Sequence, residues 1–91
     1  MLGVHREHFT ARQREVVRLI AEGCSNAEIA TRLGISPRTA KAHSDTLRIK
    51  LGVSRRRQIP AAFRTATGED PHSLQVLERE AGERESLASR P

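Results

Sequence analysis

Apolar residues recur along the first half of the chain at intervals of three and four residues, which is the spacing of one face of an α-helix. Glycines and helix-starting residues divide these positions into three separate stripes. The members are Val16, Leu19 and Ile20 in the first stripe, Ile29, Ala30 and Leu33 in the second, and Ala40, Ser44, Leu47 and Leu51 in the third. The pattern therefore predicts an all-α fold.

Residues that favour helix starts stand directly before each stripe. Thr10 and Ser25 each precede a glutamine or glutamate by three positions, the spacing of a capping box. Ser36 occupies an N-cap position, and Pro37 follows where its missing N–H costs nothing. We therefore expect a first helix capped by Thr10 and ended by a glycine, a second starting at Ser25, and a third over about 37–51.

A fourth helix is expected after the third, with an unusual first half. Ser54 is a candidate N-cap, and Arg55, Arg56 and Arg57 would then lie in the first turn, where cations oppose the helix dipole. Phosphate contact would explain them. Pro60 would lie beyond the first turn of such a helix, so we expect the helix to bend or to start late.

The outward face of the third expected helix carries chemistry suited to nucleic acid. Arg38, Lys41, Ala42 and Asp45 point away from the apolar stripe. Two cations, one small apolar side chain and one carboxylate can contact base edges and phosphates in a major groove. Gly34 can adopt a left-handed turn before this helix. Together with the preceding short helix, these features predict a helix-turn-helix motif.

Four ordered motifs along residues 9–67 share one set of positions: Thr10, Glu15, Val16, Gly23, Ser25, Asn26, Glu28, Ile29, Ala30, Thr39, Lys41, His43, Lys50, Leu51, Gly52, Val53 and Arg56. In these residues the chain resembles the four-helix DNA-binding domain of the LuxR/FixJ/GerE family of bacterial transcription regulators. The resemblance implies a transcription regulator that binds duplex DNA, as a homodimer on an inverted repeat, with the third helix in the major groove.

The expected site divides into three groups of residues. Base edges are assigned to Arg38, Lys41, Ala42 and Asp45, and phosphates to Asn26, Thr39, His43, Lys50, Arg55, Arg56 and Arg57. Because family members usually dimerise through the fourth helix, the dimer interface is assigned to Ile59, Ala62, Phe63 and Ala66.

Three departures from the family pattern affect these assignments. Ala40 and Ser44 stand where the family has larger aliphatic side chains, so the core beneath the third helix is expected to be thin. Asp45 would repel phosphate unless it accepts a hydrogen bond from a cytosine amino group or orients Arg38 or Lys41. Pro60 puts the usual dimer contact in doubt.

Charge is distributed unevenly along the 91 residues. The net charge is +5, but residues 1–68 hold 13 Lys/Arg and 5 Asp/Glu, whereas residues 69–91 hold 3 and 6. We expect a short lead over 1–9, with Phe9 under the first helix, a basic domain over 10–68, and an acidic, poorly structured tail over 69–91. The tail would compete with phosphate for Arg55 to Arg57 and cause mild autoinhibition.

Other classes of site receive little support. Cys24 is alone, so no internal disulfide is possible, and we expect a small filler at a helix junction. His5 and His8 could share a helical face but lack further ligands, so no metal or other cofactor is expected. No arrangement of nucleophile and base indicates an enzyme. Without a signal peptide or a long apolar run, the chain is expected to be cytoplasmic.

Two alternatives remain open. A sigma-factor promoter-binding domain has similar helix-start motifs but lacks the Lys-x-His and Lys-Leu-Gly-Val-x-x-Arg signatures. A protein-interaction module would instead dock on a partner such as RNA polymerase. Family members normally carry a receiver or ligand-binding domain upstream, and nothing here resembles one. We therefore expect either a free-standing regulator or the output domain of a larger one, such as a response regulator.

Overall fold

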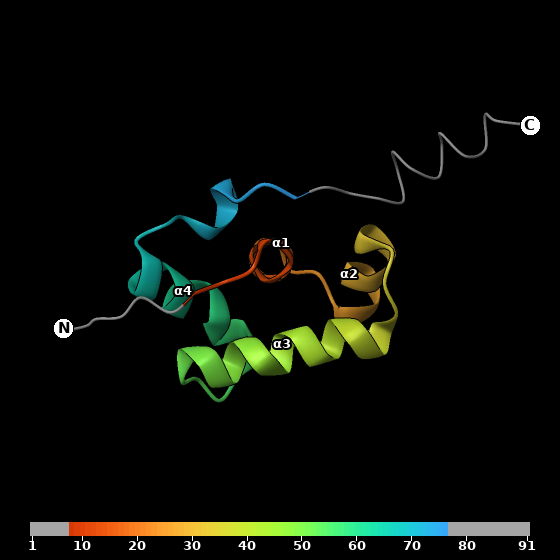
Figure 1. Ribbon diagram of the computed structural model, residues 1–91, viewed down its shortest axis with the longest axis horizontal. Helices are drawn as coiled ribbons and strands as arrows, with labels where there is room; N and C mark the ends of the chain where they lie inside the picture. Colours follow the sequence, from red (N-terminus) through yellow and green to blue (C-terminus); the bar gives the residue numbers. More distant parts are fainter. Residues whose placement is uncertain (1–7, 77–91) are drawn as a thin grey trace, which may run out of the picture.

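The computed structural model describes residues 8–76, which form four α-helices and two short 3-10 helices and contain no β-strand. The helices are α1 (Ala11–Ala21), α2 (Asn26–Leu33), α3 (Pro37–Leu51) and α4 (Ile59–Thr67), with η1 (Arg56–Gln58) before α4 and η2 (Pro71–Ser73) after it. In Figure 1, α1 is seen end-on at the centre, α3 passes below it, α2 and α4 lie at opposite sides, and η2 lies above. The predicted all-α fold is confirmed.

The predicted starts of the first three helices are also confirmed. The Thr10 hydroxyl accepts a hydrogen bond from the N–H of Gln13 at 3.0 Å, and α2 begins with the corresponding capping box of Ser25 and Glu28. The Ser36 hydroxyl accepts from the N–H of Thr39 at 3.0 Å, and α3 covers the predicted range. These local bonds pair N–H groups that have no partner within their own helices.

The hydrophobic core lies between α1, α3 and α4 and extends under α2. Its buried apolar residues are Phe9, Val16, Val17, Leu19, Ile20, Cys24, Ile29, Ala30, Leu33, Ala40, Leu47, Ile59, Phe63 and Leu74. Ala40 and Ser44 are buried, as their places in the third stripe predict. The Ser44 hydroxyl donates to the Lys41 carbonyl at 3.3 Å, which satisfies the one polar group in this stripe.

The start of α4 differs from the sequence-based prediction. Ser54 caps no helix. Instead the chain passes through η1, where the N–H of Arg55 donates to the side-chain oxygen of Gln58 at 2.9 Å, and α4 begins only at Ile59. The expectation of a late start is therefore correct. Pro60 falls in the first turn of the helix, where its missing N–H removes no intrahelical bond.

The folded part continues beyond residue 68, where we had placed the domain boundary. Pro71 and Leu74 are buried, and η2 packs against α1. Arg18 donates to the Leu74 carbonyl, and Arg14 forms an ion pair with Glu69. Residues 69–76, which we call the C-terminal strap, therefore belong to the domain. The remaining tail, 77–91, and the beginning of the lead, 1–7, lie outside the described residues.

Candidate nucleic-acid interface

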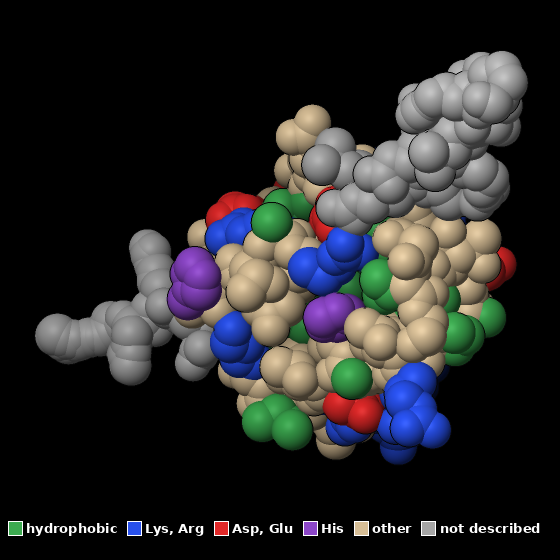
Figure 2. All heavy atoms as spheres, turned by 45° about the vertical axis from the view of Figure 1, so that its right-hand side comes forward, with side chains coloured by type: hydrophobic (Ala, Val, Ile, Leu, Met, Phe, Trp, Pro, Cys, Tyr) green, Lys and Arg blue, Asp and Glu red, His purple; other side chains and the backbone are tan. Residues whose placement is uncertain are grey.

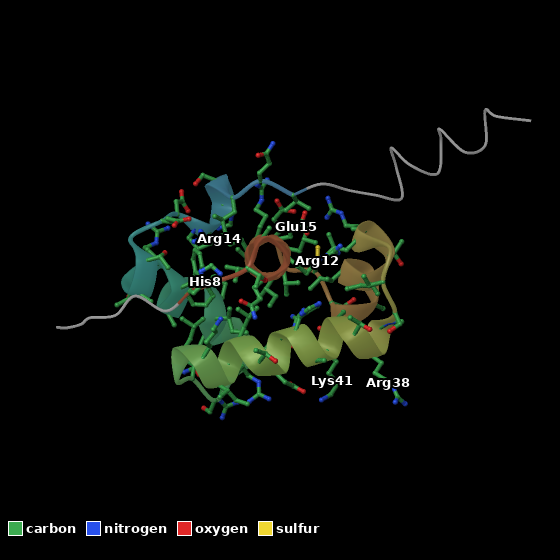
Figure 3. The ribbon with its side chains drawn as sticks, in the orientation of Figure 1. His8, Arg12, Arg14, Glu15, Arg38 and Lys41 are labelled. Carbon is green, nitrogen blue, oxygen red and sulfur yellow. The ribbon has the colours of Figure 1, made fainter. Side chains whose placement is uncertain are left out.

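The predicted base-reading residues lie together on the outer face of α3. Arg38, Lys41 and Ala42 are exposed, and Asp45 is half-buried beside them. Figure 3 shows Arg38 and Lys41 pointing away from α1 and from the rest of the domain. Figure 2 shows basic, acidic and hydrophobic side chains next to one another at the lower edge of the molecule, where α3 runs. The Lys41 side chain is 67% exposed, so a ligand can reach its ammonium group.

Asp45 binds two cations on this face. Its Oδ2 accepts from Lys41 Nζ at 2.8 Å, and its Oδ1 accepts from Arg48 Nη2 at 2.9 Å. These two hydrogen bonds hold the pKa of the carboxyl below its ordinary value, so the group stays ionised. Orientation of Lys41, one of the two roles considered above for Asp45, is therefore seen in the free protein. The sequence analysis did not single out Arg48, although its place three residues after Asp45 was a usable signal.

The turn between α2 and α3 sets the orientation of α3 relative to α2. Gly34 adopts a left-handed conformation with φ 70°, and the next N–H, that of Ile35, bonds to the Ala30 carbonyl at 3.0 Å. Ile35 packs against the core. From α1, Arg12 reaches the Leu33 carbonyl at 3.4 Å. The end of α2 is thus tied both to the turn and to α1, so α2 and α3 hold one relative orientation.

The seven residues assigned to phosphates differ in how exposed their side chains are. Thr39, Arg55 and Arg57 are exposed at the start of α3 and near η1. The Thr39 hydroxyl already accepts from the Ser36 hydroxyl at 2.9 Å, which fixes its position without covering it. These three residues are accessible to a ligand, whereas the other four are only partly exposed.

Lys50, which is predicted to contact phosphate, is engaged within the domain in the free protein. Its ammonium donates to the side-chain oxygen of Gln13 at 3.1 Å and also to the backbone carbonyl of His8. The same nitrogen lies 4.9 Å from the centre of the Phe9 ring, where a cation is attracted to the aromatic face. Lys50 therefore joins the end of α3 to the start of α1.

Arg56, which is also predicted to contact phosphate, points inward in the free protein. Its Nη2 donates to the Cys24 carbonyl at 2.8 Å, and its Nε is buried without a hydrogen-bond partner among residues 8–76. Burial lowers the pKa of this guanidinium. Arg56 thus ties η1 to the junction of α1 and α2. Cys24 is buried at that junction, as predicted.

Asn26 and His43, both predicted to contact phosphate, are half-buried. The Asn26 Oδ1 atom is buried and has no hydrogen-bond partner in the described part of the chain. Burial, with a smaller effect of the Arg12 charge, lowers the pKa of His43. The imidazole is therefore neutral at neutral pH and offers an N–H group rather than a positive charge.

Two of the four residues assigned to the dimer interface belong to the core instead. Ile59 and Phe63 are completely buried, and the Phe63 ring packs edge-on against Phe9 with centroids 5.1 Å apart. Four residues apart, they lie on one face of α4, the face that packs against α1 and α3. Ala66 is exposed and Ala62 is half-buried, so only these two remain on the accessible side of α4.

The acidic residues of the C-terminal strap do not face Arg55 to Arg57. Glu69 pairs with Arg14 on α1, and Asp70 pairs with Arg64 on α4 at 3.2 Å. The autoinhibition expected from the tail therefore has no basis in these two carboxylates. Within residues 8–76 there is no cluster of three side chains able to hold a metal ion, and no helix is long and apolar enough to cross a membrane. His5 lies outside these residues.

The shared core of the four helices, the α2–turn–α3 unit and the exposed polar face of α3 define a helix-turn-helix protein. The sequence profile described as "Bacterial regulatory proteins, luxR family" matches residues 7–61. The chain therefore belongs to this family. This result supports the LuxR/FixJ/GerE resemblance over the sigma-factor alternative.

Several curated relatives are similar to slightly more than half of the chain. A putative HTH-type transcriptional regulator of Mycobacterium tuberculosis is 48% identical over 51 residues, which are 56% of this chain and 6% of that protein. The probable transcriptional regulatory protein SgaR of Hyphomicrobium methylovorum is 50% identical over 50 residues, 55% of this chain and 24% of SgaR. The transcriptional regulatory protein UhpA of Escherichia coli is 43% identical over 49 residues, 54% of this chain and 25% of UhpA.

The matched segment thus spans a quarter or less of each of these three relatives. No solved structure matches the chain significantly.

Proposed function

We propose that this chain binds duplex DNA sequence-specifically, with α3 in the major groove, and regulates transcription without a catalytic step. The observation that carries the proposal is the exposed face of α3, where Arg38 and Lys41 point into solvent from a helix fixed on its other side by the core. A rigid helix with free polar ends is what direct readout of base edges requires. Such a regulator would act in the cytoplasm, where bacterial DNA lies.

The proposed contacts follow from exposure and charge. Arg38 and Lys41 donate to base edges, Ala42 allows close approach, and Asp45 orients Lys41 and Arg48. Thr39, Arg55 and Arg57 are proposed to contact phosphates. Thr39 is exposed in the first turn of α3, and Arg55 and Arg57 are exposed shortly after the end of α3. Phosphate contacts position a protein, whereas contacts with bases select the sequence.

Base-reading and phosphate-binding residues should respond differently to mutation. Lys41→Ala or Arg38→Ala is expected to weaken binding to the preferred site by roughly 1–3 kcal/mol, with a much smaller effect on random DNA, since a lost base contact depends on sequence. Arg57→Ala should weaken all sequences about equally and reduce the slope of affinity against salt concentration. Fluorescence anisotropy across a salt series, with a selected site and a random duplex, measures both effects.

The matched control is Arg64→Ala, which removes an exposed cation that pairs with Asp70. Arg64 lies in the last turn of α4, at the end away from η1. It should change neither specific nor nonspecific affinity beyond the effect of one distant charge. Equal losses for Lys41→Ala, Arg38→Ala and Arg57→Ala on every sequence would contradict the division into reading and positioning residues.

We further propose that two copies bind an inverted repeat and associate only on DNA. The accessible side of α4 offers small side chains, Ala62 and Ala66, while its large apolar residues are used in the core. So little apolar surface favours a weak dimer, and bound DNA would hold the two copies together. Sedimentation of the free protein at micromolar concentration should give a monomer, and addition of a two-half-site duplex should give two chains per duplex. A tight dimer without DNA, or one chain on the full site, would refute this.

A further inference from the structure

Ile49 is a large apolar residue of α3 that is exposed to solvent. Its side chain is 79% exposed, and it is the one large hydrophobic residue exposed to this degree within residues 8–76. A single exposed apolar side chain is common on protein surfaces and indicates nothing by itself. The position of Ile49 on the helix is what distinguishes it.

Ile49 continues the proposed base-reading stripe. Arg38, Ala42, Asp45 and Ile49 follow one another at steps of four, three and four residues. At about 100° per residue, all four project within an arc of about 60°. Ile49 therefore points in the same direction as Ala42, two helical turns later, and lies opposite the buried stripe of Ala40, Ser44 and Leu47.

The charged neighbours of Ile49 turn away from it. Arg48 reaches back to Asp45 at 2.9 Å and to the Ser54 carbonyl at 3.4 Å. Lys50 reaches inward to Gln13. Because Arg48 and Lys50 both form hydrogen bonds elsewhere, neither covers Ile49. The exposed face of α3 therefore ends in an apolar side chain at this position.

The distance along the helix places this apolar spot within reach of a further base pair. Seven residues separate Ile49 from Ala42, which is about 10 Å along the axis of α3. Successive base pairs are about 3.4 Å apart, so the separation corresponds to about three base pairs at most, the value for a helix parallel to the DNA axis. The C5-methyl group of thymine is the apolar group that bases display in the major groove.

We propose that Ile49 is a specificity-determining residue that packs against the C5-methyl group of a thymine, at most about three base pairs from the pair faced by Ala42. The inference rests on the proposed function, because it requires α3 to lie in the major groove. It adds to that function a preference for thymine over cytosine, which presents no methyl group at the same place.

The test removes the methyl group and nothing else. A preferred site is first selected with the full-length protein from a pool of random duplexes, and each thymine is then replaced singly by uracil, which keeps the same hydrogen-bonding groups. At one thymine the wild-type protein should lose about fourfold in affinity, the loss expected for one apolar carbon no longer buried. Ile49→Ala should bind the thymine and uracil duplexes equally at this position, and Ile49→Val should retain part of the difference.

Two controls make the result specific to Ile49. Thr46→Ala alters an exposed residue of α3 that lies to one side of the stripe, and it should keep the full thymine-to-uracil difference. Thermal unfolding of Ile49→Ala should match the wild type, because little of the side chain is buried. Thymines contacted by other side chains should keep their sensitivity to uracil in Ile49→Ala.

The outcomes separate this inference from the proposed function. If selection yields no preferred sequence, the proposed function fails and the inference fails with it. If a preferred site is found but Ile49→Ala keeps the wild-type response to uracil at every thymine, the inference alone is overturned. If wild-type binding is insensitive to uracil at all positions, Ile49 contacts no thymine methyl group and the inference is likewise overturned.

Discussion

Replacement of Phe63 by alanine is expected to lower the free energy of unfolding by about 3–5 kcal/mol, the usual cost of removing a buried aromatic side chain. Phe63 is completely buried and packs edge-on against Phe9. The guanidinium carbon of Arg14 lies 5.7 Å from the centre of the Phe63 ring. Domains of this size have a total stability of about 5 kcal/mol, so the variant should keep only about 0–2 kcal/mol. Urea denaturation followed by circular dichroism measures the loss.

Ala66→Ser is the matched control for Phe63→Ala, since Ala66 lies one turn further along α4 but is exposed. Its free energy of unfolding should stay within about 0.5 kcal/mol of the wild type. A Phe63→Ala protein that kept its stability but lost self-association would show that Phe63 is a dimer contact, contrary to its burial in the core.

Truncation after Thr67 is expected to lower the free energy of unfolding by about 2–4 kcal/mol, because it removes Leu74 and Pro71 from the surface of α1. The ion pair of Arg14 with Glu69 is partly exposed and should contribute little to this loss. Thermal and urea denaturation of the truncated and full-length proteins measure the difference. Equal stability of the two proteins would mean that the C-terminal strap does not stabilise the domain.

Truncation after Val76 is the matched control, because it keeps the whole C-terminal strap and removes only residues 77–91. We expect it to be as stable as the full-length chain. It is also the appropriate protein for asking whether the acidic residues of the tail reduce DNA affinity. Truncation after Thr67 would combine any such effect with loss of folded protein.

Local sequence signals were sufficient to predict α1, α2 and α3. Thr10, Ser25 and Ser36 cap helices through atoms three residues away, and Gly34 adopts the left-handed turn that few other residues allow. These interactions lie within one or two turns of chain, so they do not depend on how the domain packs. The exposed positions of Arg38, Lys41 and Ala42 follow from the same helical period, because the side opposite a buried stripe must face solvent.

Short-range spacing was therefore enough to predict the all-α class, the helix-turn-helix and the exposed face of α3. Only packing placed Lys50, Arg56, Phe63 and the C-terminal strap against the rest of the domain. Each of these depends on a partner at least 32 residues away in the chain, such as Cys24 for Arg56 or Gln13 for Lys50. A cation that binds phosphate and a cation that binds a backbone carbonyl look the same in the sequence, because only packing determines which acceptor is within reach.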